Sequence, residues 1–314
     1  MTRGRGAAPE GAERRGAAPE GAGPDVARTV AAVVVSYNVA DLLVACVASL
    51  RADGVERIVV VDNASRDGSV DAIRAADPDV DVVALDRNLG YGGGANRGVE
   101  RTTTPFALIL NPDVVVAPGS TAALVAALEA DPGLALVGPR IETPDGALYP
   151  SVRRFPDLLE AAGHGFLGFL WPSNPFSRRY RMEDWDHDAA ASVDWVAGTE
   201  MLVRREAWDA VGGFDEAYFM YMEDVDVCWR LHRAGWRVGY EPAARVTHAI
   251  GRSTDQTPYR MIAAHHRSLL RYASRTTTGP RRLLLPAVTV ALGVRTVLAW
   301  AQRRARGRPH AALR

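Results

Sequence analysis

The stretch TVAAVVVSYNVADLLVACVASLRADGVERIVVVDN, residues 29–63, decides the fold class. It opens with a continuous apolar, β-branched run at Thr29–Tyr37 and closes with a second run at Arg57–Val61. Such runs are typical of strands buried on both faces of a parallel sheet. Between them, Asp41–Arg51 repeats its apolar residues at helical spacing. The stretch therefore predicts a strand, a helix and a second, parallel strand.

The same alternation continues toward the C-terminus. The further predicted elements are helices at 69–76, 95–101, 120–130 and 224–234, and strands at 81–85, 106–110, 134–137, 195–204, 237–240 and 245–248. Strands that alternate with helices indicate an α/β fold: a doubly wound, largely parallel open sheet with helices on both faces.

The composition excludes several kinds of chemistry. The 314-residue chain has 37 basic residues, all of them Arg, and 37 acidic residues. The absence of Lys excludes a Lys Schiff base, a Walker A lysine and the conserved lysine of a protein kinase. The two cysteines, Cys46 and Cys228, are too few for a disulfide framework or a cysteine metal site. We expect a reducing compartment and, with no apolar N-terminal region, no secretory signal.

The charges divide the chain into an acidic body and a basic C-terminus. Residues 275–314 carry nine Arg and no acid, whereas residues 29–274 hold an excess of acids. An acidic body argues against nucleic acid as a partner. A basic C-terminus suits an anionic membrane surface.

Four regions are predicted. Residues 1–28 form a low-complexity, disordered tail that repeats RGAAPEGA, and residues 29–139 and 140–275 form two halves of one domain. The fourth region, 276–314, is a basic amphipathic segment. Its stretch 283–302 is long enough to span a bilayer, but Pro286, Gly293 and Arg295 favour a helix lying in the membrane interface. A spanning helix and a helix packed on the body remain alternatives.

Polar residues follow several of the predicted strands. Tyr37 and Asn38 follow the first, Asp62 and Asn63 the second, and Asn88 the third, while Asp113 follows the fourth as part of Asn111-Pro-Asp. The carboxyl ends of parallel strands meet at one edge, where ligands of such sheets bind. A carboxylate there can hold Mg²⁺ or Mn²⁺ against diphosphate oxygens, although Asn-Pro-Asp is also ordinary turn chemistry.

A glycine-rich stretch, NLGYGGGANRG, occupies residues 88–98 ahead of a predicted helix. Its backbone N–H groups could approach a phosphate. It follows the third strand rather than the first, which argues against a nicotinamide dinucleotide site.

The sequence EDVD at 223–226 places three carboxylates within four residues. At the start of a helix such a cluster is stabilised by the helix dipole, and it can supply a general base. A solvated first turn is the alternative, but the apolar flank AYFMYM at 217–222 argues against full solvation. His248 ends a later apolar segment, either as a structural histidine or as a metal ligand.

These motifs, in this order, resemble glycosyltransferase family 2, whose members have the GT-A nucleotide-sugar fold. The matching motifs are VVVSYN (33–38), VVVDNASRDGS (59–69), RNLGYGGGANRG (87–98), LILNPDV (108–114), WVAGTEMLVRR (195–205), GGFDEAYFMYMEDVDVCWRL (212–231) and VTHAIGRST (246–254). The pairing of NPD with FMYMEDVD points to the rhamnosyltransferase branch. The segment 148–181 is similar to actinobacterial rhamnosyltransferases of the arabinogalactan linker.

The resemblance implies roles for individual residues. Asp224 would be the catalytic base, with Glu223 on the sugar or acceptor side. Asp113 and His248 would hold the metal, a divalent Mg²⁺ or Mn²⁺; Asn111 stands where the motif has its first Asp, which weakens the case for strict metal dependence. The nucleotide-sugar site would comprise Ser36, Tyr37, Asn38, Asp62, Asn63, Asn88, Gly90, Asn96 and Asn111, and the acceptor or supporting set Trp195, Gly198, Asp226 and Arg230.

The resemblance also implies a reaction. It is the metal-dependent, inverting transfer of L-rhamnose from dTDP-L-rhamnose to a polyprenyl-diphosphate-linked GlcNAc acceptor for the cell wall. The enzyme would work as a peripheral protein on the cytoplasmic side of the plasma membrane. The alternatives are a family 2 enzyme with another donor or acceptor, a sugar nucleotidyltransferase, and a non-catalytic nucleotide-sugar-binding protein. The nucleotidyltransferase would need a Gly-rich stretch after the first strand, where this chain has SYNVAD (36–41).

Overall fold

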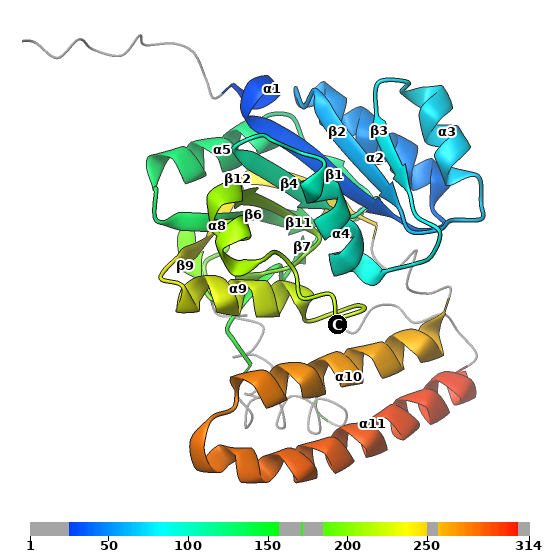
Figure 1. Cartoon of the computed structure of the whole chain (residues 1–314), viewed down its shortest axis with the longest axis vertical. Coiled ribbons are helices and arrows are strands. Elements are labelled where there is room, and N and C mark those ends of the chain that lie inside the picture. The colour runs from blue at the N-terminus through cyan, green and yellow to red at the C-terminus, as the bar shows by residue number, and fades with distance from the viewer. Residues whose placement is uncertain (1–24, 157–170, 172–184, 250–256, 307–314) are drawn as a thin grey trace, which may run out of the picture.

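The first half of the sheet is built from parallel strands joined by helices. In this computed structural model, which describes residues 25–156, 171, 185–249 and 257–306, the strand order here is β3-β2-β1-β4 (Figure 1). The elements are β1 (Val30–Ser36), α2 (Ala40–Ala52), β2 (Arg57–Asp62), α3 (Ser69–Ala76), β3 (Asp81–Ala84), α4 (Gly90–Glu100) and β4 (Phe106–Leu110). Parallel strands need such crossover helices, so the predicted alternation is confirmed for this half.

The second half of the sheet mixes strand directions. From β4 the order continues β11-β6-β12-β5; β12 is parallel to β6, whereas β11 is antiparallel to both of its neighbours. The elements are β5 (Val114–Val116), α5 (Ser120–Ala130), β6 (Leu134–Glu142), β7 (Leu148–Tyr149), β9 (Ala191–Val193), β11 (Glu200–Arg204), α8 (Arg205–Val211), α9 (Glu223–Arg233) and β12 (Arg237–His248). A separate two-stranded sheet pairs β8 (Val152–Arg153) with β10 (Trp195–Val196).

Two predicted boundaries are corrected in this half. The strand predicted over 195–204 is interrupted between β10 and β11, where the backbone N–H of Gly198 leaves the strand pattern to bond Asp224. The strands predicted at 237–240 and 245–248 are one strand, β12, whose register against β6 shifts between Glu241 and Arg245. A bulge of this kind bends a strand without ending it.

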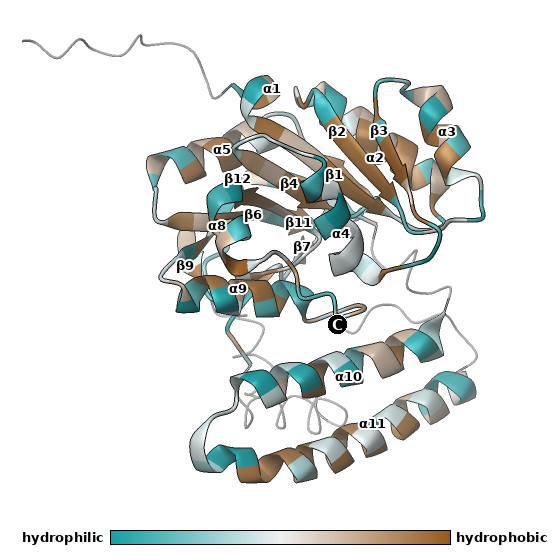
Figure 2. Ribbon diagram, in the orientation of Figure 1, coloured by the Kyte–Doolittle hydropathy of each residue, from teal (hydrophilic) through white to brown (hydrophobic). Residues whose placement is uncertain are grey.

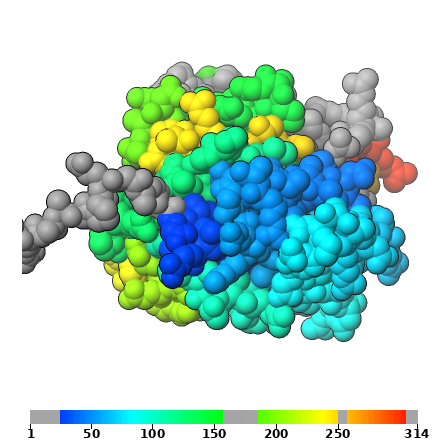
Figure 3. All heavy atoms as spheres, turned by 90° about the horizontal axis from the view of Figure 1, so that it is seen from above, coloured from blue at the N-terminus to red at the C-terminus, as the bar shows by residue number. Residues whose placement is uncertain are grey.

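The sheet has a hydrophobic core on each face. Along β1, Val33 and Val35 pack into the core that α4 and α9 cover, whereas Val30 and Val34 pack into the core under α2 and α5. Because successive side chains of a strand point to opposite faces, a strand that is apolar throughout must be covered twice. The predicted doubly wound fold class is therefore confirmed, and Figure 3 shows the blue-to-cyan first half packed directly against the green and yellow second half.

The glycine-rich stretch is a helix rather than the predicted turn. α4 begins at Gly90, five residues before the predicted helix at 95–101. A Cβ at Gly94 would lie 2.7 Å from Val35, and one at Gly98 would lie 2.2 Å from Val33. Both contacts are shorter than atoms tolerate, so these glycines let the helix lie close against β1.

The C-terminal helices form a hairpin beside the sheet domain. α10 (Pro258–Thr276) lies next to the body, and after the 3₁₀ turn η2 (Gly279–Leu284), α11 (Leu285–Arg306) lies alongside α10 (Figure 1). At the other end of the chain, α1 (Val26–Thr29) shows that the disorder predicted for residues 1–28 is wrong for the last three of them. Residues 1–24, and most of the segment 148–181, lie outside the described residues.

Candidate active site

Asp113 and His248 form a buried pair at the end of the sheet. Asp113 ends the turn after β4, and His248 is the last residue of β12, where it is in register with Val114. The Nε2 atom of His248 lies 3.0 Å from Oδ1 of Asp113, and both side chains are buried. Nδ1 of His248 is buried without a hydrogen-bond partner in the described structure. The structure thus brings together the two residues predicted to hold a metal.

The chemistry of this pair fits a divalent cation that also binds phosphate. A carboxylate oxygen and an imidazole nitrogen are both ligands of Mn²⁺, and carboxylate suits Mg²⁺. Among the described residues, no group of three or more His, Cys, Asp or Glu side chains is placed to hold a metal ion. The described part of the chain therefore offers two ligands, and the remaining positions of a bound cation would be left to substrate oxygens and water.

A second polar group lies at the ends of β1 and β2. Ser36 and Asp62 are the last residues of the two strands and are paired in register. Asp62 accepts a hydrogen bond at Oδ2 from the backbone N–H of Ser65, at 2.8 Å, but Oδ1 has no hydrogen-bond partner among the residues that the structure describes. The hydroxyl of Ser36 is likewise buried without a partner in the described structure. Unpaired buried polar atoms are costly, so this edge is suited to a ligand that supplies hydrogen bonds.

Three predicted nucleotide-site residues shape the loops around this edge. Asn38, in the left-handed region at φ 53°, accepts a hydrogen bond from Arg66 N–H at 2.7 Å. Asn63 donates to the carbonyl of Gly90 at 3.0 Å, and Asn88 accepts from the Gly90 N–H at 2.8 Å. These side chains fix the segment that leads into α4. Tyr37 and Asn111 are half-buried at the same strand ends.

Gly90 is the point where α4 meets the loop before α9. Its φ is +83°, and a Cβ there would lie 2.0 Å from the carbonyl oxygen of Phe219. That carbonyl accepts a hydrogen bond from the N–H of Tyr91 at 3.2 Å. Only glycine satisfies both the conformation and the contact.

Glu223 and Asp224 begin α9 after a strained turn. Tyr221 and Met222 both have positive φ, at 66° and 69°, which side chains of this size rarely adopt. The turn places Glu223 in a buried position and leaves Asp224 half-buried. Asp224 accepts hydrogen bonds from the backbone N–H groups of Gly198, at 2.9 Å, and Val225, at 2.8 Å. The predicted carboxylate cluster is therefore not a solvated turn.

Burial and mutual repulsion separate the protonation of these two carboxyls. Burial raises the pKa of both, and the charge of Asp224 raises that of Glu223 further, well above its usual value. The two N–H donors to Asp224 lower its pKa, whereas Oε2 of Glu223 has no partner among the described residues. Of the two carboxyls, Asp224 therefore keeps its ionised form more readily than Glu223.

Tyr91 ties these groups together, and the sequence patterns did not single it out. Its hydroxyl donates to the carbonyl of Gly198 at 2.5 Å. Burial raises the pKa of Tyr91 well above its usual value, and the charges of Glu223, Asp224, Glu200 and Asp113 raise it further. The charges of four carboxyls therefore act on this one phenol, although the carboxyls come from three separate segments of the chain.

Arg153 is a second residue that the patterns missed. Its guanidinium lies over the ring of Trp195, 5.5 Å from the ring centre, where β8 pairs with β10. Its positive charge lowers the pKa of Asp224. The indole N–H of Trp195 donates to the carbonyl of Arg154 at 2.8 Å, so the tryptophan holds this sheet in place.

Glu200 is the third missed residue. It begins β11 opposite Leu110 of β4, is fully buried, and has no hydrogen-bond partner for either carboxyl oxygen in the described structure. Burial, with a contribution from the charge of Asp53, raises the pKa of Glu200 to about 8. A lone Glu in an apolar strand pattern carries no signal of this environment.

Two predicted supporting residues have structural partners. Asp226 is fully buried and accepts a hydrogen bond from Arg230 at 2.7 Å. The same guanidinium donates to the carbonyls of Val211, at 2.6 Å, and Gly213, at 2.7 Å. The pairing expected of Arg230 with the acidic cluster is thus present, and it anchors α9 to the loop after α8.

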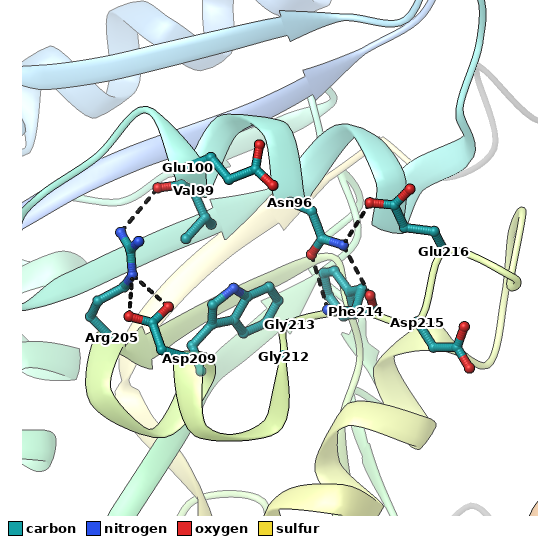
Figure 4. Close-up of a pocket in the computed structure, with 11 residues that line it drawn as sticks. Asn96, Val99, Glu100, Arg205, Asp209, Gly212, Gly213, Phe214, Asp215 and Glu216 are labelled. Carbon is teal, nitrogen blue, oxygen red and sulfur yellow. Dashed lines mark hydrogen bonds and ion pairs between the residues drawn. The ribbon is translucent and has the colours of Figure 1, made fainter.

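Asn96 lies at a different place from the strand-end residues. Its side-chain amide bonds both backbone groups of Phe214, at 2.9 and 3.0 Å, and reaches Glu216 at 3.2 Å. Figure 4 shows it in a surface pocket between α4 and the segment 205–216. Its amide is therefore occupied in joining two segments.

Comparisons with known proteins agree with this geometry. The profile described as Glycosyl transferase family 2 matches residues 31–202. The N-acetylglucosaminyl-diphospho-decaprenol L-rhamnosyltransferase of Mycobacterium tuberculosis is 40% identical over 222 residues, which cover 67% of this chain and 72% of that protein. Rhamnosyltransferase WbbL of Escherichia coli K12 is 36% identical over 125 residues, or 40% of this chain and 44% of the relative.

Solved structures are similar in fold. A mannosyltransferase from Pyrobaculum calidifontis, solved with GDP-Man and Mn²⁺, superposes with a TM-score of 0.55 at 19% identity, covering 91% of this chain and 78% of that one. GalNAc-T7, solved with UDP, GalNAc and Mn²⁺, superposes with a TM-score of 0.53 at 16% identity, covering 70% of this chain and 43% of that one. At these identities the similarity concerns the fold alone.

Proposed function

The chain belongs to glycosyltransferase family 2, and from that membership we propose that it transfers L-rhamnose from dTDP-L-rhamnose to a polyprenyl-diphosphate-linked GlcNAc by an inverting mechanism. The chain is a glycosyltransferase with the GT-A fold, and its relatives include rhamnosyltransferases. The transferred sugar, the donor nucleotide, the acceptor, the stereochemistry and the metal dependence are the proposed parts.

The observation that carries the proposal is the position of the segment 198–199 between the two parts of the site: the Gly198 N–H donates to Asp224 at 2.9 Å, and the Thr199 carbonyl accepts from the Asn111 N–H at 2.9 Å, two residues before Asp113. It joins the Asp113–His248 pair, from the end of β4 and β12, to the Glu223–Asp224 turn. A nucleotide-sugar transferase needs these two functions side by side: one group that holds the diphosphate and one that deprotonates the acceptor.

Asp62 and Ser36 are proposed to bind the nucleoside part of the donor. Their unpartnered oxygens, Oδ1 and Oγ, lie at the ends of adjacent strands. A thymine imide N–H or a ribose hydroxyl would supply the missing hydrogen bonds. Asn38, Asn63 and Asn88 would keep the surrounding loops in position.

Asp113 and His248 are proposed to hold a divalent cation against the donor diphosphate. When bound, the cation would offset the charge that develops on the departing nucleoside diphosphate. The two side chains already lie 3.0 Å apart and are shielded from solvent, so little ordering would be needed for them to bind. Solved neighbours in this fold contain Mn²⁺ with a nucleotide or nucleotide-sugar.

Asp224 is proposed as the general base. Its carboxylate is held by two backbone N–H groups, keeps an exposed part, and is proposed to be the ionised member of its pair with Glu223. It would take the proton of the acceptor hydroxyl as that oxygen attacks the anomeric carbon from the side opposite the leaving group. Glu223, as a neutral acid, would donate a hydrogen bond to the sugar or the acceptor.

The relative from Mycobacterium tuberculosis is named for a decaprenol-linked acceptor. We extend that acceptor class to this chain and propose that it works peripherally on the cytoplasmic side of the membrane. One helix, Gly279–Arg304, is long and apolar enough to cross a membrane by length and composition. A family 2 enzyme with another donor or acceptor is the second candidate.

Sugar transfer with a panel of donors tests the proposal. The enzyme is incubated with GlcNAc-diphospho-polyprenol and dTDP-rhamnose, UDP-sugars or GDP-sugars, with and without EDTA, and the products are weighed by mass spectrometry. We expect a product heavier by one deoxyhexose with dTDP-rhamnose alone, and its loss in EDTA. Transfer from another donor in place of dTDP-rhamnose would overturn the rhamnosyl assignment while keeping the transferase.

A further inference from the structure

α11 exposes an apolar face that has no partner in the described structure. The exposed fractions of its outward side chains are 67% for Val290, 51% for Val294, 62% for Val297 and 50% for Leu298. Figure 2 shows this hydrophobic colour along much of α11, with hydrophilic residues near its ends. Surface helices normally place charge outward, so this arrangement points to an apolar surrounding.

Two polar residues near the middle of α11, Arg295 and Thr296, lie toward α10 instead. Arg295 is half-buried, and its charge, together with burial, lowers the pKa of His266 on α10. Thr296 lies 3.1 Å from Nδ1 of the same histidine. Between Arg282 and Arg304, no exposed residue of this helix is charged. Arginines therefore mark the two ends of the face, as expected for a surface that meets anionic headgroups.

The packing against α10 favours a helix that lies in the membrane surface rather than across it. The indole N–H of Trp300 donates to the carbonyl of Tyr259 at 3.1 Å, so α11 is bonded to α10 near its C-terminal end. α10 carries Arg271 and Arg275, which pair with Asp215 of the body at 2.8 and 2.7 Å. A spanning α11 would break these contacts or draw charged groups into hydrocarbon.

α10 also holds the turn that leads to the catalytic carboxyls. The hydroxyl of Ser268 donates to the carbonyl of Met220 at 3.0 Å. The ring of His265 packs edge-on against Tyr221, with 5.2 Å between ring centres. The guanidinium of Arg260 lies over Phe219, 5.2 Å from its ring centre. Three consecutive residues of the turn therefore contact α10.

We propose that the outer face of α11 docks into an anionic lipid bilayer and that α10 holds the catalytic turn on this platform, so that docking places Glu223 and Asp224 at the membrane surface. The inference of a lipid bilayer as the occupant rests in part on the proposed lipid-linked acceptor. The apolar face would enter the boundary between headgroups and acyl chains, while the end arginines meet lipid phosphates.

Vesicle binding tests the docking surface without any sugar transfer. The full-length protein is sedimented with vesicles of phosphatidylcholine alone or mixed with phosphatidylglycerol. We expect binding to the anionic vesicles and at least tenfold weaker binding for the double variant Val294→Glu/Val297→Glu. Ala126→Glu, at an exposed position of α5, is the matched control and should bind like wild type. Circular dichroism checks that both variants are folded.

Two outcomes of this experiment would overturn the proposal that the outer face of α11 docks into a bilayer. One is equal vesicle binding by the double variant and wild type. The other is a wild-type dimer in solution that the double variant breaks, since the face would then be covered by a second copy. If vesicle binding follows the prediction but no donor is used, the proposed sugar transfer fails and the docking surface stands.

Hydrogen exchange tests the link through α10. On binding anionic vesicles, backbone amides of residues 219–224 should exchange more slowly, along with those of α11. Ser268→Ala removes the hydrogen bond to Met220 and should reduce the protection of the turn while leaving vesicle binding within twofold of wild type. Protection confined to α11 in the wild-type protein would contradict the link.

Discussion

The backbone N–H of Gly198 donates a hydrogen bond to Oδ2 of Asp224 at 2.9 Å. The two residues lie in different segments, between β10 and β11 and at the start of α9. A Cβ at Gly198 would lie 3.4 Å from that of Asp224, an ordinary van der Waals distance, so the two residues lie side by side. The bond fixes one carboxylate oxygen and favours its ionised form, as a base requires.

Asp224→Asn should abolish turnover and spare nucleotide binding. The amide keeps the shape of the side chain but cannot accept a proton, and loss of a general base costs about 10²–10⁴-fold in rate. The measurement is kcat for transfer together with dTDP affinity by calorimetry, which should stay within about threefold of wild type. Turnover close to wild type would refute the assignment of the base.

Asp113→Ala should weaken dTDP binding when a divalent cation is present. In EDTA, wild type and variant should bind equally, because the carboxylate acts through the cation. We expect a loss of about tenfold or more with Mn²⁺, since losing a ligand weakens metal affinity at least as much as losing its supporting contacts. His248→Ala should likewise weaken dTDP binding when the cation is present. Identical titration curves for wild type and variant in both conditions would contradict the metal site.

Arg153→Gln should move the acidic limb of the pH profile of kcat/KM to higher pH. The charge of Arg153 lowers the pKa of Asp224, so its removal leaves the base protonated over a wider range. Arg154→Gln is the matched control, because Arg154 is the exposed neighbour and should leave the limb in place. A limb that stays put in Arg153→Gln, or moves to lower pH, would show that Arg153 does not act on the base.

Glu200→Gln should remove a stability loss that sets in as pH rises. The pKa of Glu200 is about 8 in the folded protein against 4.5 as its ordinary value. The unfolded chain therefore ionises first, and the folded state loses stability progressively from about pH 4.5 to pH 8. Relative to wild type, the variant should gain up to about 4 kcal/mol in unfolding free energy between pH 5 and pH 8. Urea unfolding curves of both proteins at pH 5 and pH 8 measure this difference. If the difference in unfolding free energy between variant and wild type is the same at both pH values, the raised pKa is contradicted.

Gly90→Ala should be far more damaging than Gly68→Ala. The φ angle is +83° at Gly90 and +84° at Gly68. Both substitutions therefore carry a backbone strain of about 1–2 kcal/mol. At Gly90 the new Cβ would also meet the carbonyl of Phe219 at 2.0 Å, whereas nothing lies within 4 Å at Gly68. Thermal unfolding of the two variants separates strain from contact. Equal losses of thermal stability in the two variants would show that the contact between residue 90 and the Phe219 carbonyl does not affect stability.

Much of the fold followed from local patterns. Apolar runs such as Val33–Val35 can only be strands covered on both faces, and polar residues at their ends were correctly expected to gather at one edge. The start of α4 was predicted wrongly because of its glycines. Glycine normally ends helices, but here it allows close packing against β1. The break at Gly198 was missed because its cause, the carboxylate of Asp224, lies 26 residues away.

The site was predicted in part for the same reason. Asp113 and His248 were paired through the family resemblance, since nothing local relates residues 135 positions apart. Glu200, Arg153 and Tyr91 escaped notice because their roles depend on burial and neighbours that only the folded chain creates. Asn96 is the opposite case. It lies inside a motif that matches the family, but its side-chain amide is already hydrogen-bonded to the backbone of Phe214.

The stereochemistry of the transferred sugar tests whether the reaction is a single displacement assisted by Asp224. The product formed from dTDP-L-rhamnose and GlcNAc-diphospho-polyprenol is isolated, and the configuration of its anomeric carbon is determined by NMR. We expect one added rhamnose with configuration opposite to that of the donor, and none from Asp224→Asn. Retained configuration, or an equal yield from Asp224→Asn, would contradict a single displacement assisted by Asp224.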